Sequence, residues 1–393
     1  MKERITRAGN WLAQNRTPCI LLAAGCAAGG LFLLLRQDRA AMDRAASLAM
    51  GTRQAVSALA DLLPFSLAEA LCTALGVWLL VMAAATVRAQ LRRRRVLARR
   101  LVGLAAVAVW IWAGVSWLWG VHYYAASFSE KSGLAAEPVT AEALEATTLW
   151  FAEGANRTGR LVERDDSGRL AVDSAAIMEE GTDSLAPLTE EYPFLDGPAR
   201  QPKPAAYSWF MSAAGFTGYI FPFTGESTLN MDCPNVFLPV TIAHEQAHQR
   251  GVAPEQEANF VGIAACLASA DELWQYSGWL FGFLHLSNAL YTADPTAWLE
   301  VWQLLEEGPA ADLLWNDEYW LAFESPATDL AESTYTAFLE SYGQDLGMAS
   351  YGACVDLLVA RYCPLWQEAW DGRPFNKFCE KVEFCVPLSS DVL

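Results

Sequence analysis

Three long uncharged, apolar stretches near the start of the chain constrain its fold more than any other feature. They are residues 17–35, 70–87 and 101–129. A helix of about 20 mostly apolar residues can cross a hydrocarbon core of about 30 Å. Three such runs in succession predict three transmembrane helices in a membrane domain of residues 1–125, with a lipid bilayer as a partner.

The predicted membrane spans are about 17–36, 65–87 and 101–124. Segments rich in lysine and arginine stay on the cytoplasmic side of a membrane. Residues 88–100, between the second and third spans, contain seven arginines, so we expect them in the cytoplasm together with the basic N-terminus. The chain after about residue 125 would then lie outside the cytoplasm. The expected location is a plasma membrane, crossed several times.

The ends of the spans add detail to this topology. Four aromatic residues are expected to form an interfacial belt at the outer end of the third span: Trp117, Trp119, Tyr123 and Tyr124. Four arginines make the loop after the first span mildly basic, which weakens the contrast between the two sides: Arg36, Arg39, Arg44 and Arg53. A cleaved signal peptide is the alternative for the first span, and cleavage would leave the orientation of the other two spans unchanged.

The charge of the chain divides sharply at the end of the third span. Residues 1–123 contain 15 Lys and Arg against 5 Asp and Glu, whereas residues 124–393 contain 12 against 40. Binding to phosphate backbones requires clustered positive charge. A domain this acidic is therefore not expected to bind nucleic acid.

Residues 126–393 are expected to form a second, mostly helical domain with a small β-element. Helical patterns are seen at 140–156, 172–180, 205–214, 254–276, 277–291, 295–307, 309–322, 329–346 and 350–361. Aromatic residues broken by Gly, Pro and Thr at 216–230 predict a strand–turn–strand, with Pro222 suited to an edge strand. Such an edge can pair with an extended peptide; a packed hairpin without a substrate role is an equal alternative.

The segment Thr241-Ile-Ala-His-Glu-Gln-Ala-His-Gln-Arg-Gly251 carries the chemistry of the chain. His244 and His248 are four residues apart, so on a helix both imidazoles can reach one metal ion. Glu245 points about 100° around the helix axis, where it can act as a general base on a water molecule. The pattern predicts a zinc site of a hydrolase. Two solvated histidines on a surface helix are the alternative.

A third metal ligand is expected from the helix that follows. Glu255 has a small residue three positions on and Asn259 four positions on, as in many zincin peptidases, so Asn259 could hold the ligand by a hydrogen bond. Glu257 is the alternative ligand, although it is rotated by about 200° from Glu255. A later acidic residue, Asp271 or Glu272, is a further alternative. Acidic residues that simply favour a helix N-terminus would also explain the two glutamates.

The blocks at 221–226, 241–251 and 255–260 resemble a family of bacterial membrane proteins of uncharacterised function that is grouped with the zincin metallopeptidases. Its layout of three N-terminal spans followed by this domain is similar, and Ser350-Tyr-Gly352 resembles another of its elements. The resemblance implies a zincin-like domain and a zinc-dependent peptidase fold, but no substrate. A metzincin is excluded because Pro254 stands where those enzymes have a third histidine.

We therefore expect a membrane-anchored zinc metallopeptidase that binds one Zn²⁺ ion and hydrolyses a peptide or protein substrate outside the cytoplasm. Tyr351 and His285 are candidates for stabilising the oxyanion, and a structural role is the alternative for each. The rival function is a catalytically inactive zinc-binding sensor or scaffold of the cell envelope. An intramembrane protease is disfavoured because the histidine motif lies outside every apolar segment. Substrate, oligomeric state and disulfide pairing stay open.

Overall fold

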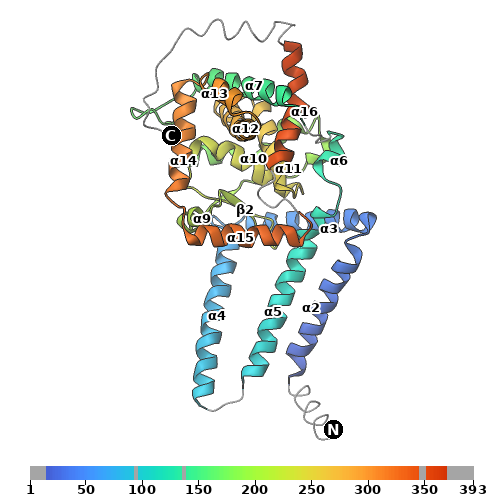
Figure 1. Cartoon of the computed structure of the whole chain (residues 1–393). Coiled ribbons are helices and arrows are strands. Elements are labelled where there is room, and N and C mark those ends of the chain that lie inside the picture. The colour runs from blue at the N-terminus through green and yellow to red at the C-terminus, as the bar shows by residue number, and fades with distance from the viewer. Residues whose placement is uncertain (1–14, 93–95, 135–138, 345–350, 370–393) are drawn as a thin grey trace.

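The computed structural model describes residues 15–92, 96–134, 139–344 and 351–369. Of these described residues, 72% are in helices and 3% in strands, with three apolar helices near the start of the chain and one small sheet. This confirms the mainly α fold class. Figure 1 shows the three apolar helices standing side by side below a compact helical region.

Among the residues that the structure describes, three helices are long and apolar enough to cross a membrane. They are α2 (Arg16–Leu35), α4 (Leu67–Leu91) and α5 (Leu97–Leu118), with mean hydropathies of 2.2, 2.1 and 2.0. Each overlaps a predicted span. α2 packs closely on α5 because Gly25 and Gly29 leave room for the tryptophan rings of α5.

The loop expected after the first span is a helix, α3 (Arg39–Ala60), which lies across the domain ends of the spans (Figure 1). The Asp38 side chain caps it by accepting a hydrogen bond from Ala41 N. Its buried residues recur every three or four positions: Met42, Ala46, Ala49, Arg53, Ser57 and Ala60. This spacing places them on one face of a helix. The face covers the junction between the apolar helices and the domain.

Of the four aromatic residues expected as an interfacial belt, Trp119 is buried and the other three are half-buried, and the belt stays a prediction. Trp119 is only 5% exposed, and the ring of Tyr124 packs edge-on to Phe32 of α2. Tyr123 packs against Tyr342, which follows α15 (Pro326–Ser341). Neighbouring helices cover this end of α5, and the aromatic side chains form a small core there.

The domain is a set of helices around the hydrophobic α12 (Glu272–Ala293), which is packed on several sides. The helices in this region are α6 (Phe128–Ser132), α7 (Ala141–Gly159), α8 (Ser174–Glu180), α9 (Ser208–Ala213), α10 (Leu238–Gln249), α11 (Glu255–Ala268), α13 (Pro295–Trp302), α14 (Glu307–Leu321) and α16 (Tyr351–Ala369). α7, α10, α11 and α16 all contribute to the same core.

The predicted boundary between two long helices was wrong. The helix expected at 254–276 is divided into α11, which ends at Ala268, and α12, which begins at Glu272. The Asp271 carboxylate accepts hydrogen bonds from the backbone N–H groups of Leu273 and Trp274. A side-chain cap of this kind starts a new helix, so the chain turns at residues 269–271 and not at 277.

The small sheet has the strand order β1-β3-β2, formed by β1 (Lys203–Pro204), β2 (Gly218–Ile220) and β3 (Ser227–Leu229). β2 runs antiparallel to β3 and is an edge strand. The predicted strand–turn–strand at 216–230 is therefore confirmed. The Ser227 hydroxyl donates to the Glu245 carbonyl at 3.3 Å, which fixes the sheet beside α10.

Candidate metal centre

α10 carries the histidine motif on a buried helix. The side chain of Gln246 anchors this helix to a neighbouring loop, since it accepts from Ser184 N and donates to Gly181 O. The helix ends at Gln249, and Gly251 shortly after it has a φ of +84°, which is strained for residues with a Cβ. The short turn after Gly251 returns the chain toward α10, so the first residue of α11 lies over the motif.

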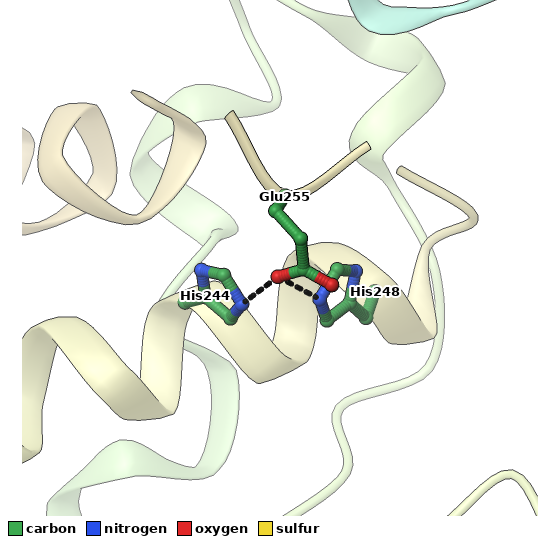
Figure 2. Close-up of side chains that lie close together, drawn as sticks. All are labelled: His244, His248 and Glu255. Atoms are coloured by element: carbon green, nitrogen blue, oxygen red, sulfur yellow. Dashed lines mark ion pairs between the residues drawn. The ribbon is translucent and has the colours of Figure 1, made fainter. Parts of the chain in front are cut away.

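His244, His248 and Glu255 come together at this turn (Figure 2). Glu255 Oε2 lies 3.3 Å from His244 Nε2 and 3.5 Å from His248 Nε2. The possible ligand atoms of the three residues all lie within 4.8 Å of one another. The arrangement is therefore a compact set of two nitrogens and one carboxylate.

The three side chains fit a zinc ion. Zinc bonds of about 2.0–2.1 Å at tetrahedral angles place neighbouring ligand atoms about 3.3 Å apart, which matches both distances from Glu255 Oε2. His248 Nδ1–H donates to Val252 O at 2.6 Å, which leaves the Nε2 lone pair directed at the cluster. Two histidines and one carboxylate with an open fourth position form a donor set of catalytic zinc sites.

Tyr335 of α15 holds the carboxylate of this set. Its hydroxyl donates to Glu255 Oε1 at 2.6 Å, while Oε2 faces the two imidazoles. Burial, followed by the charge of Glu255, raises the pKa of Tyr335 well above its ordinary value. The phenol therefore stays protonated and can fix the orientation of the carboxylate.

Glu245 lies beside the cluster and is buried, with 3% exposure. A Cβ added at Gly218 of β2 would lie 2.6 Å from Glu245 Oε1, so the absence of a side chain there makes room for the carboxylate. Within the described part of the chain, Glu245 Oε2 has no hydrogen-bond partner. Burial raises the pKa of Glu245, and the charges of His248 and His244 only partly oppose that rise. A carboxylate in this state is suited to take up a proton.

In the metal-free cluster the histidines and Glu255 stabilise one another's charges. Burial lowers the pKa of His248, but the Glu255 carboxylate and Glu245 outweigh burial and raise it to about 9. Burial likewise opposes ionisation of Glu255, and His248 and His244 nevertheless hold its pKa well below the ordinary value. A divalent cation would take the place of the protons that balance these carboxylates.

The alternative ligands are engaged elsewhere. The Glu257 carboxylate accepts hydrogen bonds from Phe128 N at 2.8 Å and Ser129 N at 3.0 Å, so it caps α6. Asp271 caps α12, and Glu272 is exposed at the start of that helix. Of the four acidic candidates, the structure brings only Glu255 to the histidines.

The remaining candidates differ in how close they lie to the cluster. Asn259 is half-buried one turn after Glu255, and no hydrogen bond between these two side chains is found in the described chain; its supporting role stays a prediction. His285 packs against Phe281 with ring centroids 4.6 Å apart, and burial followed by the charge of His244 lowers its pKa to about 4. Tyr351 begins α16, but its side chain lies outside the described residues. Neither oxyanion role is tested.

Sequence reasoning missed the residues beneath the cluster. Trp119 packs edge-on to His248, with ring centroids 5.4 Å apart, and the guanidinium of Arg53 lies 5.0 Å from the Trp119 ring centroid. Arg53 also donates to His122 Nε2 at 3.0 Å. This hydrogen bond requires that Nε2 carries no proton, so the His122 ring is neutral. Burial, with the charges of Arg53 and Lys131, lowers the pKa of His122 well below its ordinary value. No periodicity or motif links these residues to α10, since they lie more than 100 positions earlier.

Comparison with known protein families assigns the chain to one of them. A family model described as a protein of unknown function (DUF3810) matches residues 47–359. The chain belongs to this family. The DUF3810 match begins within α3 and ends within α16, so it includes α4, α5 and the whole candidate metal centre. Comparisons with curated proteins and with solved structures found no match.

Proposed function

We propose that the protein is a membrane-anchored, zinc-dependent metallopeptidase of the zincin class that hydrolyses peptide bonds outside the cytoplasm. One observation carries the proposal: His244, His248 and Glu255 converge at distances suited to zinc, while the buried Glu245 carboxylate beside them has an oxygen without a partner in the described chain. A structural metal site has no need of such a carboxylate.

His244, His248 and Glu255 would hold the ion, which would supply a Lewis acid for the carbonyl of the scissile bond. Glu245 would accept the proton of the attacking water, in keeping with its raised pKa, and pass it to the leaving amine. Tyr335 would keep Glu255 oriented through its hydrogen bond. The open edge of β2 would bind an extended peptide by main-chain hydrogen bonds, directly beside Glu245.

The charge distribution supports the proposed orientation. α4 ends and α5 begins away from the domain (Figure 1), and residues 88–100 of the sequence, which include the end of α4 and the start of α5, contain seven arginines. Because basic connections stay in the cytoplasm, the domain would lie on the other side. At the domain end, arginines of α3 are partly neutralised, since Arg39 forms ion pairs with Asp43 and Glu130.

Metal analysis of the purified full-length protein, beside a Glu245→Gln variant and with a peptide-library cleavage assay, tests this function. We expect about one zinc per chain in both proteins and cleavage by the wild type alone. Zinc in both proteins without Glu245-dependent cleavage would overturn the peptidase and leave the sensor. If the wild type binds no more metal than a His244→Ala variant, both functions are excluded.

A further inference from the structure

The candidate metal centre lies directly beyond the ends of the apolar helices. Trp119, the first residue after α5, contacts the His248 ring. Tyr335, which holds Glu255, belongs to α15, and this helix lies flat across the tops of the spans (Figure 1). A peptide bond at the cluster would therefore be at the level where a polypeptide chain leaves the bilayer.

α4 and α5 meet away from the domain and separate toward it (Figure 1). At the far end Arg100 of α5 donates to Thr86 Oγ1 at 2.7 Å and to Met82 O at 3.3 Å. No residue is buried in the apolar 18-residue stretch of α4, whereas 17% of the residues are buried in the corresponding stretches of α2 and α5. An apolar segment of another polypeptide can thus lie against α4 without displacing any described part of the chain.

A hollow of about 540 Å³ lies between α4 and Tyr335, the residue whose hydroxyl bonds to Glu255. Its walls include residues of α4, the α9 region, β2 and α15: Cys72, Thr73, Tyr207, Phe210, Tyr219 and Tyr335. Cys72 lies about 40° around the axis of α4 from Thr86, whose hydroxyl accepts from Arg100 of α5. At the other end, the Tyr335 hydroxyl bonds to Glu255. The hollow therefore extends from the Cys72 side of α4 to a residue that contacts a ligand of the cluster.

The β2–β3 hairpin lies over the gap between α4 and α5. Its turn packs against α5, since a Cβ at Gly114 would lie 2.5 Å from the Phe223 ring. Its other side is fixed to the start of α4, where Leu67 N donates to Glu226 Oε1 at 3.1 Å and Ser66 Oγ lies 3.0 Å from Thr228 Oγ1. The edge strand β2 is thus held between the two apolar helices, beside Glu245.

We propose that the substrates are membrane-anchored polypeptides. The apolar anchor of the substrate lies against the face of α4 that carries Cys72, and the chain that leaves the bilayer passes through the hollow, along β2, to Glu245. This substrate class rests on the proposed peptidase function. The occupant is a polypeptide because the path ends at a strand edge and a general base, neither of which a free lipid requires.

The chain offers two native thiols for a binding test that needs neither zinc nor cleavage. Cys72 lines the hollow, and Cys26 is exposed on α2, outside it. The full-length Glu245→Gln protein is placed in lipid nanodiscs with single-span peptides that carry one cysteine at successive depths, and a bis-maleimide links the thiols. We expect at least about tenfold more crosslinking to Cys72 than to Cys26. Equal crosslinking of the two, or labelling of Cys72 by a maleimide lipid alone, would overturn the proposal.

Cleavage gives a second test, with one reporter peptide in soluble form and fused to a membrane-spanning helix. We expect the anchored reporter to be cleaved at least about tenfold faster, an advantage that Cys72→Trp removes by filling the hollow. Ala74→Trp is the matched control, because Ala74 is exposed on nearly the opposite face of α4. Equal rates for both reporters would overturn the substrate class and keep the peptidase. Absence of Glu245-dependent cleavage of either would overturn the peptidase, and crosslinking would then decide the binding path alone.

Discussion

Two glutamates that stand two residues apart at the start of α11 have different tasks. Glu255 faces His244 and His248, whereas Glu257 points away and caps α6. The separation follows from the rotation of about 200° between them. The same chemical group thus serves the metal centre at one position and stability at the other.

Replacing each glutamate by alanine should separate these tasks. We expect Glu255→Ala to lose zinc on dialysis, because the cluster retains only two ligands. Glu257→Ala should keep its zinc and lower the free energy of unfolding by about 1–3 kcal/mol, because the capping hydrogen bonds to α6 are lost. Metal analysis and denaturant unfolding in detergent measure the two effects. Loss of zinc from Glu257→Ala alone would contradict the assignment.

Zinc binding should depend on pH through His248. The pKa of His248 is raised to about 9 in the metal-free protein, so below that pH its imidazolium must lose a proton before it can bind zinc. The apparent zinc affinity should therefore rise with pH, by about tenfold per unit for one released proton, and level off above about 9. Competition titrations with a chelator of known pH dependence test this. An affinity that is flat from pH 6 to 9 would be inconsistent with the protonated cluster.

At the scale of elements, β2 and α10 fit together because β2 begins with glycine. Any Cβ at Gly218 would meet Glu245 Oε1 at 2.6 Å and the Leu229 side chain at 2.8 Å. The carboxylate is the flexible partner, so a side chain at this position would displace the Glu245 carboxylate before it moved His244, His248 or Glu255.

Gly218→Ala should therefore reduce cleavage while zinc is retained. A displacement of about 1 Å in a catalytic group can cost about 100-fold in rate, and we expect a loss of at least about tenfold in kcat with unchanged zinc content. Gly30→Ala is the matched control, because a Cβ at Gly30 would meet nothing within 4 Å. The assignment of Glu245 as general base would be weakened if the two variants cleaved the reporter equally fast.

At the scale of the whole molecule, the apolar helices and the domain share a core. Phe32 of α2, Met42 of α3, Val121 and Tyr342 belong to one buried cluster. Trp119 continues this cluster to His248. The metal centre is consequently supported from below by residues that the sequence places in the membrane region.

Trp119→Ala should show how much this support contributes. Removal of a buried tryptophan side chain costs about 3–5 kcal/mol, and the loss of the ring beneath His248 should also speed zinc release. Thermal unfolding and chelator-driven zinc release in detergent measure both. Trp78→Ala is the control, since Trp78 is 39% exposed on α4. Equal effects of the two substitutions would mean that the membrane region does not support the metal centre.

The sequence by itself determined the three apolar helices, the hairpin at 216–230, the histidine motif and the turn that brings α11 over it. Each is a local pattern: a run of apolar residues, a two- or four-residue spacing, or a glycine at a helix end. The tertiary structure decided between Glu255 and Glu257, packed aromatic residues at the end of α5 against neighbouring helices, and placed Tyr335 and Trp119 at the cluster. These outcomes depend on packing between segments that lie far apart in the chain, about which a local pattern contains no information. The same packing sets the metal centre at the membrane end of the domain, which the spacing of His244 and His248 could not reveal.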